Sequence, residues 1–233
     1  MSFQTSVRYD WGLGVPGELI YDGPSRAQAG FIQSASAAYN IIGATAFTQP
    51  AAGGAVKAGG TGIFFGILAN PKTAISFGNS SDGPLGTTLT LPNNVEGSFV
   101  QMGYLLVSVP AACSIGDQLY FDQTTGALGT INPIITATAS QTTTVVTVTA
   151  ITAGNIGVGS VLQGPTGVPV TVKSLGTGTG GVGTYNVDSS QSVSSGAYSG
   201  STVAPSGITL IAGGFIDKFP QSGAGVAVAR LSI

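Results

Sequence analysis

Almost every apolar stretch in this chain of 233 residues is short, rich in β-branched or aromatic residues, and ended by Gly, Pro, Asn or Asp. Examples are IFFGILA at 63–69, YLLVSV at 104–109 and ITLIAGGFI at 208–216. Such runs are typical of strands. No window has a convincing helical period, and the one Ala-rich window, residues 25–40, is interrupted by Gly and Ser. The sequence therefore predicts an all-β fold.

Two turn sequences indicate where strands reverse direction. The segment DQTTGAL, residues 122–128, places Gly126 where a hairpin needs a left-handed residue. The segment LPNNVEG, residues 91–97, combines Pro with two consecutive Asn, which favour turns. Asp117 and Asp122 flank the strand between 118 and 121. We interpret both carboxylates as turn caps rather than metal ligands.

The composition changes near Asn132-Pro133. Residues 134–204 are dominated by Thr, Ser, Gly and Val, and their only charged residues are Lys173 and Asp188. Mixed composition returns after residue 204. We therefore expect an extended N-terminal arm over residues 1–30, a base domain over 31–133 and 205–233, and a small β domain over 134–204. The small domain is expected to be inserted in a surface hairpin of the base, because the ends of an inserted unit lie close together.

The charge content is unusual for a soluble domain. Only 7% of the residues are charged, whereas about 25% is ordinary. The surface must then consist mainly of Ser, Thr, Asn, Gln and Gly, which protect it poorly against association. We interpret the chain as one that packs against other proteins. Its seven Lys and Arg residues are scattered without a basic stripe, so we expect no nucleic-acid partner.

Side chains for common catalytic chemistry are scarce. The chain has no His, which removes His-based triads and His metal sites. Its single Cys, Cys113, lies among small and apolar residues and is interpreted as a buried structural thiol. None of the nine acidic residues belongs to a calcium-loop pattern or stands out as a carboxylate pair for glycoside hydrolysis. We predict no enzyme, no catalytic residue, no metal and no cofactor.

The apolar stretches fall far short of a membrane span, and the first 14 residues contain no signal-like apolar region. We therefore expect a chain that is made in the cytoplasm and has no membrane partner.

A run of glycines, SLGTGTGGVGTYNVDSS at 174–190, contains the pattern G-x-G-x-x-G at Gly176, Gly178 and Gly181. A dinucleotide site needs a helix that opens on the last of these glycines. The residues that follow are Thr, Tyr, Val, Ser and Gly, with few helix formers. The run is therefore interpreted as a turn between two strands rather than a phosphate cradle.

Two parts of the sequence resemble known phage proteins. The N-terminal block MSFQTSVRYDWGLGVPGELIYDGPSRAQAGFI, the segment YNIIGATAFT and the ending SGAGVAVARLSI resemble the structural cement or decoration proteins of tailed bacteriophages. This resemblance covers about residues 1–133 and 205–233. The segment from TTVVTVTAIT to the glycine run resembles a small β module that recurs in phage virion proteins, including tail and head fibres.

The first resemblance implies a fold, a function and partners. The base is expected to be a β-barrel or jelly roll that sits on the outer capsid surface of the virion. There it would bind the major capsid protein without catalysis and cement neighbouring capsid proteins, as a homo-oligomer such as a dimer or trimer. The expected contacts to the capsid or to another subunit are the large or charged groups of the arm: Arg8, Tyr9, Trp11, Tyr21 and Arg26.

Two other functions are weighed. A head-fibre or receptor-binding decoration protein would use residues 134–204 to read glycans, but that segment has only two aromatic residues, Tyr185 and Tyr198, and one acid. Glycan sites usually need stacking rings and convergent polar groups. A secreted hydrolase or a surface-layer protein would need a signal or a catalytic constellation, and neither is found.

Overall fold

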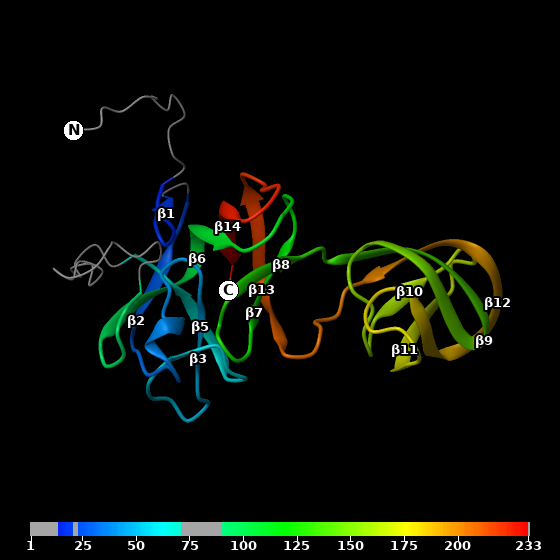
Figure 1. Ribbon diagram of the computed structural model, residues 1–233, viewed down its shortest axis with the longest axis horizontal. Coiled ribbons are helices and arrows are strands. Elements are labelled where there is room, and N and C mark those ends of the chain that lie inside the picture. Colours follow the sequence, from blue (N-terminus) through cyan, green and yellow to red (C-terminus); the bar gives the residue numbers. More distant parts are fainter. Residues whose placement is uncertain (1–13, 21–22, 71–89, 233) are drawn as a thin grey trace, which may run out of the picture.

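The computed structural model describes residues 14–20, 23–70 and 90–232 (Figure 1). In these ranges the chain consists of strands and one short 3-10 helix, η1 (Ala37–Tyr39). The predicted all-β fold class is confirmed.

The Ala-rich window forms a strand followed by η1, because Gly and Ser interrupt any helical run. The strands are β1 (Leu19–Ile20), β2 (Arg26–Phe31), β3 (Ala46–Gln49), β4 (Lys57–Ala58), β5 (Ile63–Leu68), β6 (Glu96–Val109), β7 (Gln118–Asp122), β8 (Leu128–Ile131), β9 (Ile134–Ala153), β10 (Val161–Gln163), β11 (Pro169–Leu175), β12 (Gly183–Ser201), β13 (Ile208–Lys218) and β14 (Gly225–Ser232).

The base is one sheet whose ends meet. Its strands follow the path β4–β3–β5–β6–β14–β13–β7–β8, with β1 and β2 paired to β6. The N–H of Ala46 donates to the Gly126 carbonyl at 2.9 Å, and the N–H of Leu128 donates to the Ala44 carbonyl at 2.9 Å. Thr45 and Ala127 form an antiparallel bridge between these two bonds. The sheet is therefore closed into a barrel, which removes the edges that β3 and β8 would otherwise expose.

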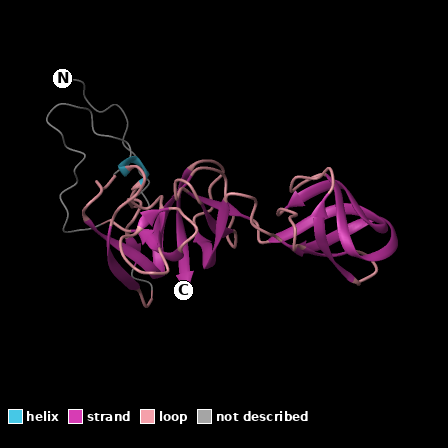
Figure 2. Cartoon of the chain, turned by 90° about the horizontal axis from the view of Figure 1, so that it is seen from below, coloured by secondary structure: helices cyan, strands magenta, loops and turns pink. Residues whose placement is uncertain are grey.

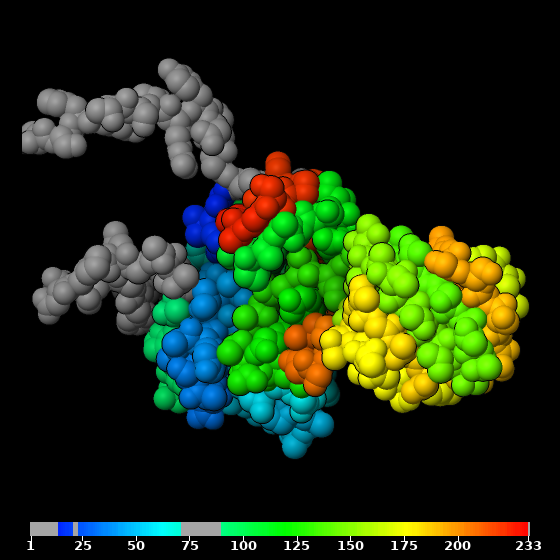
Figure 3. Space-filling model, turned by 45° about the vertical axis from the view of Figure 1, so that its right-hand side comes forward, coloured from blue at the N-terminus to red at the C-terminus, as the bar shows by residue number. Residues whose placement is uncertain are grey.

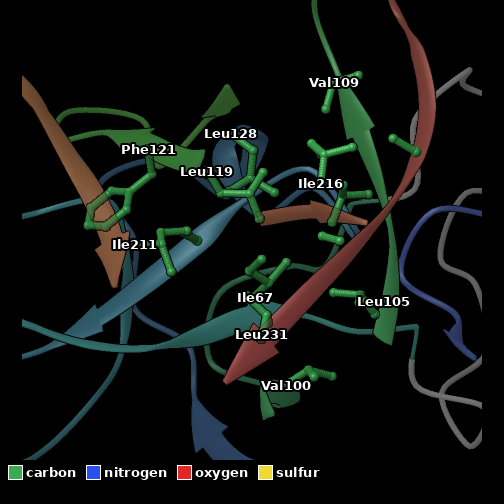
Figure 4. Packing of buried hydrophobic residues seen from close by; sticks show 14 of the residues in the cluster. Ile67, Val100, Leu105, Val109, Leu119, Phe121, Leu128, Ile211, Ile216 and Leu231 are labelled. Carbon is green, nitrogen blue, oxygen red and sulfur yellow. The ribbon is translucent and has the colours of Figure 1, made fainter. Parts of the chain in front are cut away.

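The closed sheet encloses an apolar core to which seven strands contribute. Figure 4 shows Ile67, Leu105, Leu119, Ile216 and Leu231 converging from different strands. The buried members of this core are Ala46, Ile67, Ala69, Val100, Leu105, Val107, Val109, Cys113, Leu119, Phe121, Leu128, Ile211, Ile216, Ala227, Ala229 and Leu231. Cys113 is a buried free thiol, as predicted.

A second apolar cluster of the base is built around aromatic rings. The ring centroid of Phe99 lies 4.8 Å from that of Phe47 and 5.3 Å from that of Phe65, within the range of favourable aromatic pairs. Ile32 and Val56, both fully buried, belong to the same cluster. This cluster joins β3, β5 and β6 to the segments before and after them.

Residues 134–201 form a second sheet with the order β10–β11–β12–β9 and a separate apolar core. We call these residues the module. Strands β9 and β12 pair along nearly their whole length. Strand β10 pairs with β11 and also with the end of β12. Because β11 also pairs with β12, these three strands form a closed set. Figures 1 and 2 show the module beside the base, connected to it by two chain segments.

The β9–β12 ribbon bends where its register shifts, between Asn186 and Gln191. Gln141 lies at this bend with 2% of its surface exposed. Its side-chain amide donates to the Ser189 carbonyl at 2.8 Å and to the Thr143 carbonyl at 3.0 Å. The side chain therefore bonds two backbone acceptors that lie beside the register shift.

The module does not enter the base through a hairpin, so that expectation is wrong. Strand β7 pairs with β8 and with β13, antiparallel in both cases. Strands β8 and β13 therefore run parallel to each other with β7 between them. Parallel strands need a crossover connection rather than a tight turn. The module occupies this crossover. The division of the chain at residues 30, 133 and 204 remains a prediction.

Part of the segment assigned to the arm lies on the base. Strands β1 and β2 both pair with β6, which is long enough to hold them in addition to β5 and β14. Between them, Pro24 and Ser25 pass close to Gly103 of β6. A Cβ on Gly103 would lie 3.0 Å from the Ser25 Cβ, and the φ of Gly103 is +122°. Glycine therefore suits this position in both its space and its backbone conformation.

Candidate functional site

The five predicted contact residues are not brought together in the described part of the chain. Arg8, Tyr9, Trp11 and Tyr21 lie outside the described residues. Arg26 is the first residue of β2, opposite Met102 of β6, and its side chain is exposed. The structure therefore shows the position of Arg26 alone, on the surface, and its role as a contact stays a prediction.

Strand β2 is the most exposed strand of the base. Every residue from Arg26 to Ala29 is exposed, and Phe31 has 48% of its surface exposed. A shallow hollow of about 260 Å³ lies at its end, lined by Ala29, Gly30, Phe31 and Glu96. Gly30 faces the aromatic cluster, because a Cβ there would lie 2.8 Å from the Phe65 ring and 3.0 Å from the Phe99 ring. Sequence reasoning missed this surface, although the small residues of RAQAG are its signal.

Other large apolar side chains of the base also face solvent. Ile63 has 65% of its surface exposed, Ile115 has 63% and Phe219 has 47%. Phe219 has a φ of +59°, a left-handed conformation that is uncommon for a bulky residue. These side chains are far apart in sequence, and single exposed apolar residues are normal on a protein surface.

The glycine run of the module packs around a tyrosine. The Tyr185 hydroxyl donates to the Gly181 carbonyl at 2.7 Å and accepts a hydrogen bond of 3.1 Å from the Gly180 N–H. A Cβ on Gly178 would lie 2.3 Å from the Tyr185 ring. The run connects β11 to β12, so no helix follows it. The interpretation as a turn is confirmed, and the close approach to Tyr185 explains the need for Gly178.

Both aromatic rings of the module are buried. Tyr185 is 0% exposed and Tyr198 is 3% exposed. Burial raises the pKa of both phenols above the usual value. Neither ring is available to stack on a sugar, which removes the aromatic support for a glycan site in the module.

Asp117 and Asp122 cap turns and are not metal ligands in the described structure. Asp117 accepts a hydrogen bond of 2.8 Å from the Ser114 N–H. Asp122 accepts from the N–H groups of Thr125 at 2.7 Å and Thr124 at 2.9 Å. The bond from the Thr125 N–H is the main reason that the pKa of Asp122 lies below its usual value. Both carboxylates hold the turns at the two ends of β7, as predicted.

The described residues lack two other kinds of site. Among the described residues, no group of three or more Cys, Asp or Glu side chains is placed to hold a metal ion. In the same part of the chain, no helix has the length and apolar character needed to cross a membrane.

Comparison with protein families gives a match over residues 3–161 to the family described as "Structural cement protein (E217 gp24/Pam3 gp6)", a phage family. The match covers more than half of the chain. This chain belongs to the phage structural cement protein family. The matched part of this cement protein contains β1 to β9 and ends at the first residue of β10, so it includes the beginning of the module. Comparison with individual curated proteins gives no match.

Proposed function

We propose that this cement protein binds the outer surface of the phage capsid and holds neighbouring major capsid proteins together, so that the filled head is more stable. The family match over residues 3–161 is the observation that carries this proposal. A protein that binds only the assembled shell shifts the equilibrium toward that shell by mass action. Such a role needs a folded body and contacts that cross a subunit boundary, and needs no reacting group.

The surface supports this role. With 7% charged residues, the chain offers mainly uncharged polar and small side chains for contact. Removing such groups from water costs less than removing charged groups, which must be paired when they are buried. The exposed strand β2, with Phe31 next to a shallow hollow, offers a compact contact region on the base. We propose that Arg26 contacts a capsid protein or another subunit at this strand, together with Arg8, Tyr9, Trp11 and Tyr21 of the arm.

The glycan-reading alternative is weaker, because both module rings are buried. The module instead has its own core and stands beside the base, as Figure 3 shows. We propose that the module enlarges the contact area of the cement protein on the shell.

A rebinding experiment tests this function. Phage heads stripped of the protein are mixed with purified protein, sedimented, and heated with a dye that reports released DNA. Binding in a fixed ratio to the major capsid protein, with a higher release temperature, is the expected result. Binding that leaves the release temperature unchanged would contradict the cementing role, and a lack of binding would contradict the capsid partner.

A further inference from the structure

Among the described residues, no strand pairs with the outer edge of β2 over residues 26–30. Ile32 directs its N–H toward the side of β6, where it donates at 2.9 Å to the carbonyl of Val95, the residue before that strand. Phe31 directs its carbonyl the other way, where it accepts from the Val56 N–H at 2.8 Å. Because these directions alternate along a strand, the N–H and C=O groups of Ala27 and Ala29 point away from β6. We call these four groups the β2 edge.

Within the ranges that the structure describes, β6 is the one strand paired with β2 over residues 26–30. Natural proteins usually protect such an edge with charged residues, prolines or bulges. Arg26 is the one charged residue of β2, the strand has no proline, and the one register shift against β6 lies between Arg26 and Ala27, at the start of the strand. Its small side chains leave room for a neighbouring backbone. The β2 edge is therefore suited to accept an additional strand.

The hollow at the end of β2 extends toward β6, because its lining residue Glu96 is the β6 partner of Phe31. Its lining by Ala29, Gly30, Phe31 and Glu96 brings an exposed aromatic ring next to the last outward-facing groups. In strand addition, the backbone hydrogen bonds give affinity and pockets for alternate side chains give specificity. An added strand with apolar residues at every second position would set them beside Phe31 on one face of the sheet.

The N-terminal segment of the chain has this pattern. Residues 2–11 read SFQTSVRYDW, in which polar and β-forming residues alternate without exception. The β-forming set is Phe3, Thr5, Val7, Tyr9 and Trp11, and the polar set is Ser2, Gln4, Ser6, Arg8 and Asp10. A period of two is the signature of a strand with one apolar face.

We propose that residues 2–11 of one copy add as a strand to the β2 edge of a second copy. The β-forming set then lies on the face of the sheet that carries Phe31, and the backbone groups of Ala27 and Ala29 are hydrogen-bonded. The inference rests on the proposed function, because such an exchange ties adjacent copies on the shell. It also specifies what that function leaves open, namely which surface links one copy to the next.

A second copy is the better source of the added strand, because the chain's own arm must first cover the distance from Gly14 to the β2 edge. Gly14 lies against Leu106 of β6, whereas Ala27 is opposite Val100. About six positions along a strand span about 20 Å. An arm that folded back on its own base would use about six residues to cover that distance, at about 3.3 Å for each residue. Residues 8–13 would then be used to cover the distance, leaving residues 2–7 for the edge, whereas an arm from a neighbouring copy could lie there along all of residues 2–11, with Tyr9 and Trp11 included.

Disulfide trapping between two different chains tests the exchange. All variants carry Cys113→Ser. One tagged chain carries Ala29→Cys, and a second, untagged chain carries one cysteine at position 3, 4, 5, 6, 7, 8 or 9. The two chains are mixed in solution, oxidised and separated without reductant. A covalent product that contains both chains can form only when the arm of one copy reaches β2 of another, because a disulfide needs Cβ atoms about 4 Å apart.

The expected result is a yield of mixed product that alternates along the arm, high at odd positions and low at even positions. A flat profile or no product would overturn the proposal. In a further variant, a single chain carries both Ala29→Cys and one cysteine in the N-terminal arm. An internal disulfide there, without mixed product, would assign the edge to the chain's own arm and would also overturn the proposal.

A second measurement needs no cysteine. Ala29→Pro removes the outward N–H, whereas the control Ala29→Ser keeps it. In sedimentation experiments, we expect Ala29→Pro to weaken self-association at least tenfold, to the level of a chain that lacks residues 2–11, and Ala29→Ser to leave it unchanged. Equal association of all variants would contradict the exchange. Wild-type binding to stripped heads is measured separately, so failure of the exchange and failure of the cementing function are distinguishable.

Discussion

The hydroxyl of Tyr185 donates a 2.7 Å hydrogen bond to the carbonyl of Gly181, and this bond fixes the glycine run of the module. The N–H of Gly180 donates to the same hydroxyl. The run thus folds over a buried phenol, and its resemblance to a phosphate-binding pattern is a consequence of that packing. Tyr198, the second tyrosine of the module, has a buried hydroxyl without a hydrogen-bond partner.

This difference between the two tyrosines predicts opposite outcomes for the same substitution. Tyr185→Phe leaves the buried Gly180 N–H and the part-buried Gly181 carbonyl without their partner and should lower the free energy of unfolding by about 1–3 kcal/mol. Tyr198→Phe removes a polar group that has no partner and should leave stability unchanged or raise it. Denaturant unfolding of both variants measures the contrast. Equal losses in the two variants would show that the loop does not depend on the Tyr185 hydroxyl.

Two glycines of the run should differ in their tolerance of a methyl group. A Cβ on Gly178 would lie 2.3 Å from the Tyr185 ring, whereas the nearest atom to a Cβ on Gly181 is 3.7 Å away. Gly178→Ala should cost about 1–3 kcal/mol through overpacking. Gly181→Ala should change stability by less than about 0.5 kcal/mol. Thermal unfolding of the two variants checks the prediction, and a harmless Gly178→Ala would contradict it.

Closure of the barrel at Gly126 gives a third prediction. Gly126 has a φ of +76°, and a Cβ there would lie 2.5 Å from the Gly59 nitrogen and 2.6 Å from the Ala46 oxygen. Gly116 has a φ of +90° with no atom within 4 Å of a Cβ. Gly116→Ala should cost about 1–2 kcal/mol, from backbone strain alone. Gly126→Ala should cost clearly more, because backbone atoms must also move apart.

The measurement for this pair is the denaturant midpoint, with Gly116→Ala as the control for strain. Similar midpoints for the two variants would mean that the Thr45–Ala127 bridge is not tightly packed, and closure of the sheet there would lose its support.

Local sequence rules predicted the features that depend on a few neighbouring residues. Gly126 takes a left-handed conformation in the β7–β8 hairpin, Asn94 does so in the 91–97 turn, and Asp122 caps its turn. Each of these follows from the backbone preferences of single residue types. The strand-forming runs were recognised for the same reason.

The remaining features depend on residues that are far apart in the sequence. No local pattern indicates that Thr45 meets Ala127, or that β7 separates β8 from β13. The pairing of β2 with β6 was missed because RAQAG has few strand formers, and β6 supplies the partner. Arg8, Tyr9, Trp11 and Tyr21 lie outside the described residues, so their role as contacts stays a prediction.

The lowered pKa of Asp122 predicts a pH dependence. Because the native-state pKa is lower than that of the unfolded chain, the stabilisation is complete above about pH 4. It is lost as the pH falls through the native-state pKa. Asp122→Asn should therefore be less stable than the wild type at pH 7, and the difference should be smaller at pH 2. Unfolding midpoints at both pH values test this, and a constant difference would contradict it.

The separate core of the module predicts independent folding. The cluster that contains Ile135, Val146 and Tyr185 includes no residue of the base. A fragment of residues 132–204 should unfold cooperatively on its own. Where the module meets the base, the N–H of Thr202 donates to the Pro133 carbonyl at 3.0 Å, so a short linker can replace the module. An unfolded fragment, measured by circular dichroism, would contradict the division at residues 133 and 204.

The central claim is that this cement protein binds outside the shell and joins neighbouring capsid proteins. Electron cryomicroscopy of stripped heads, with and without added protein, tests it most directly. The account predicts added density on the outer surface that contacts at least two adjacent major capsid proteins and contains the barrel. Density confined to a single capsid protein, or located inside the shell, would contradict it.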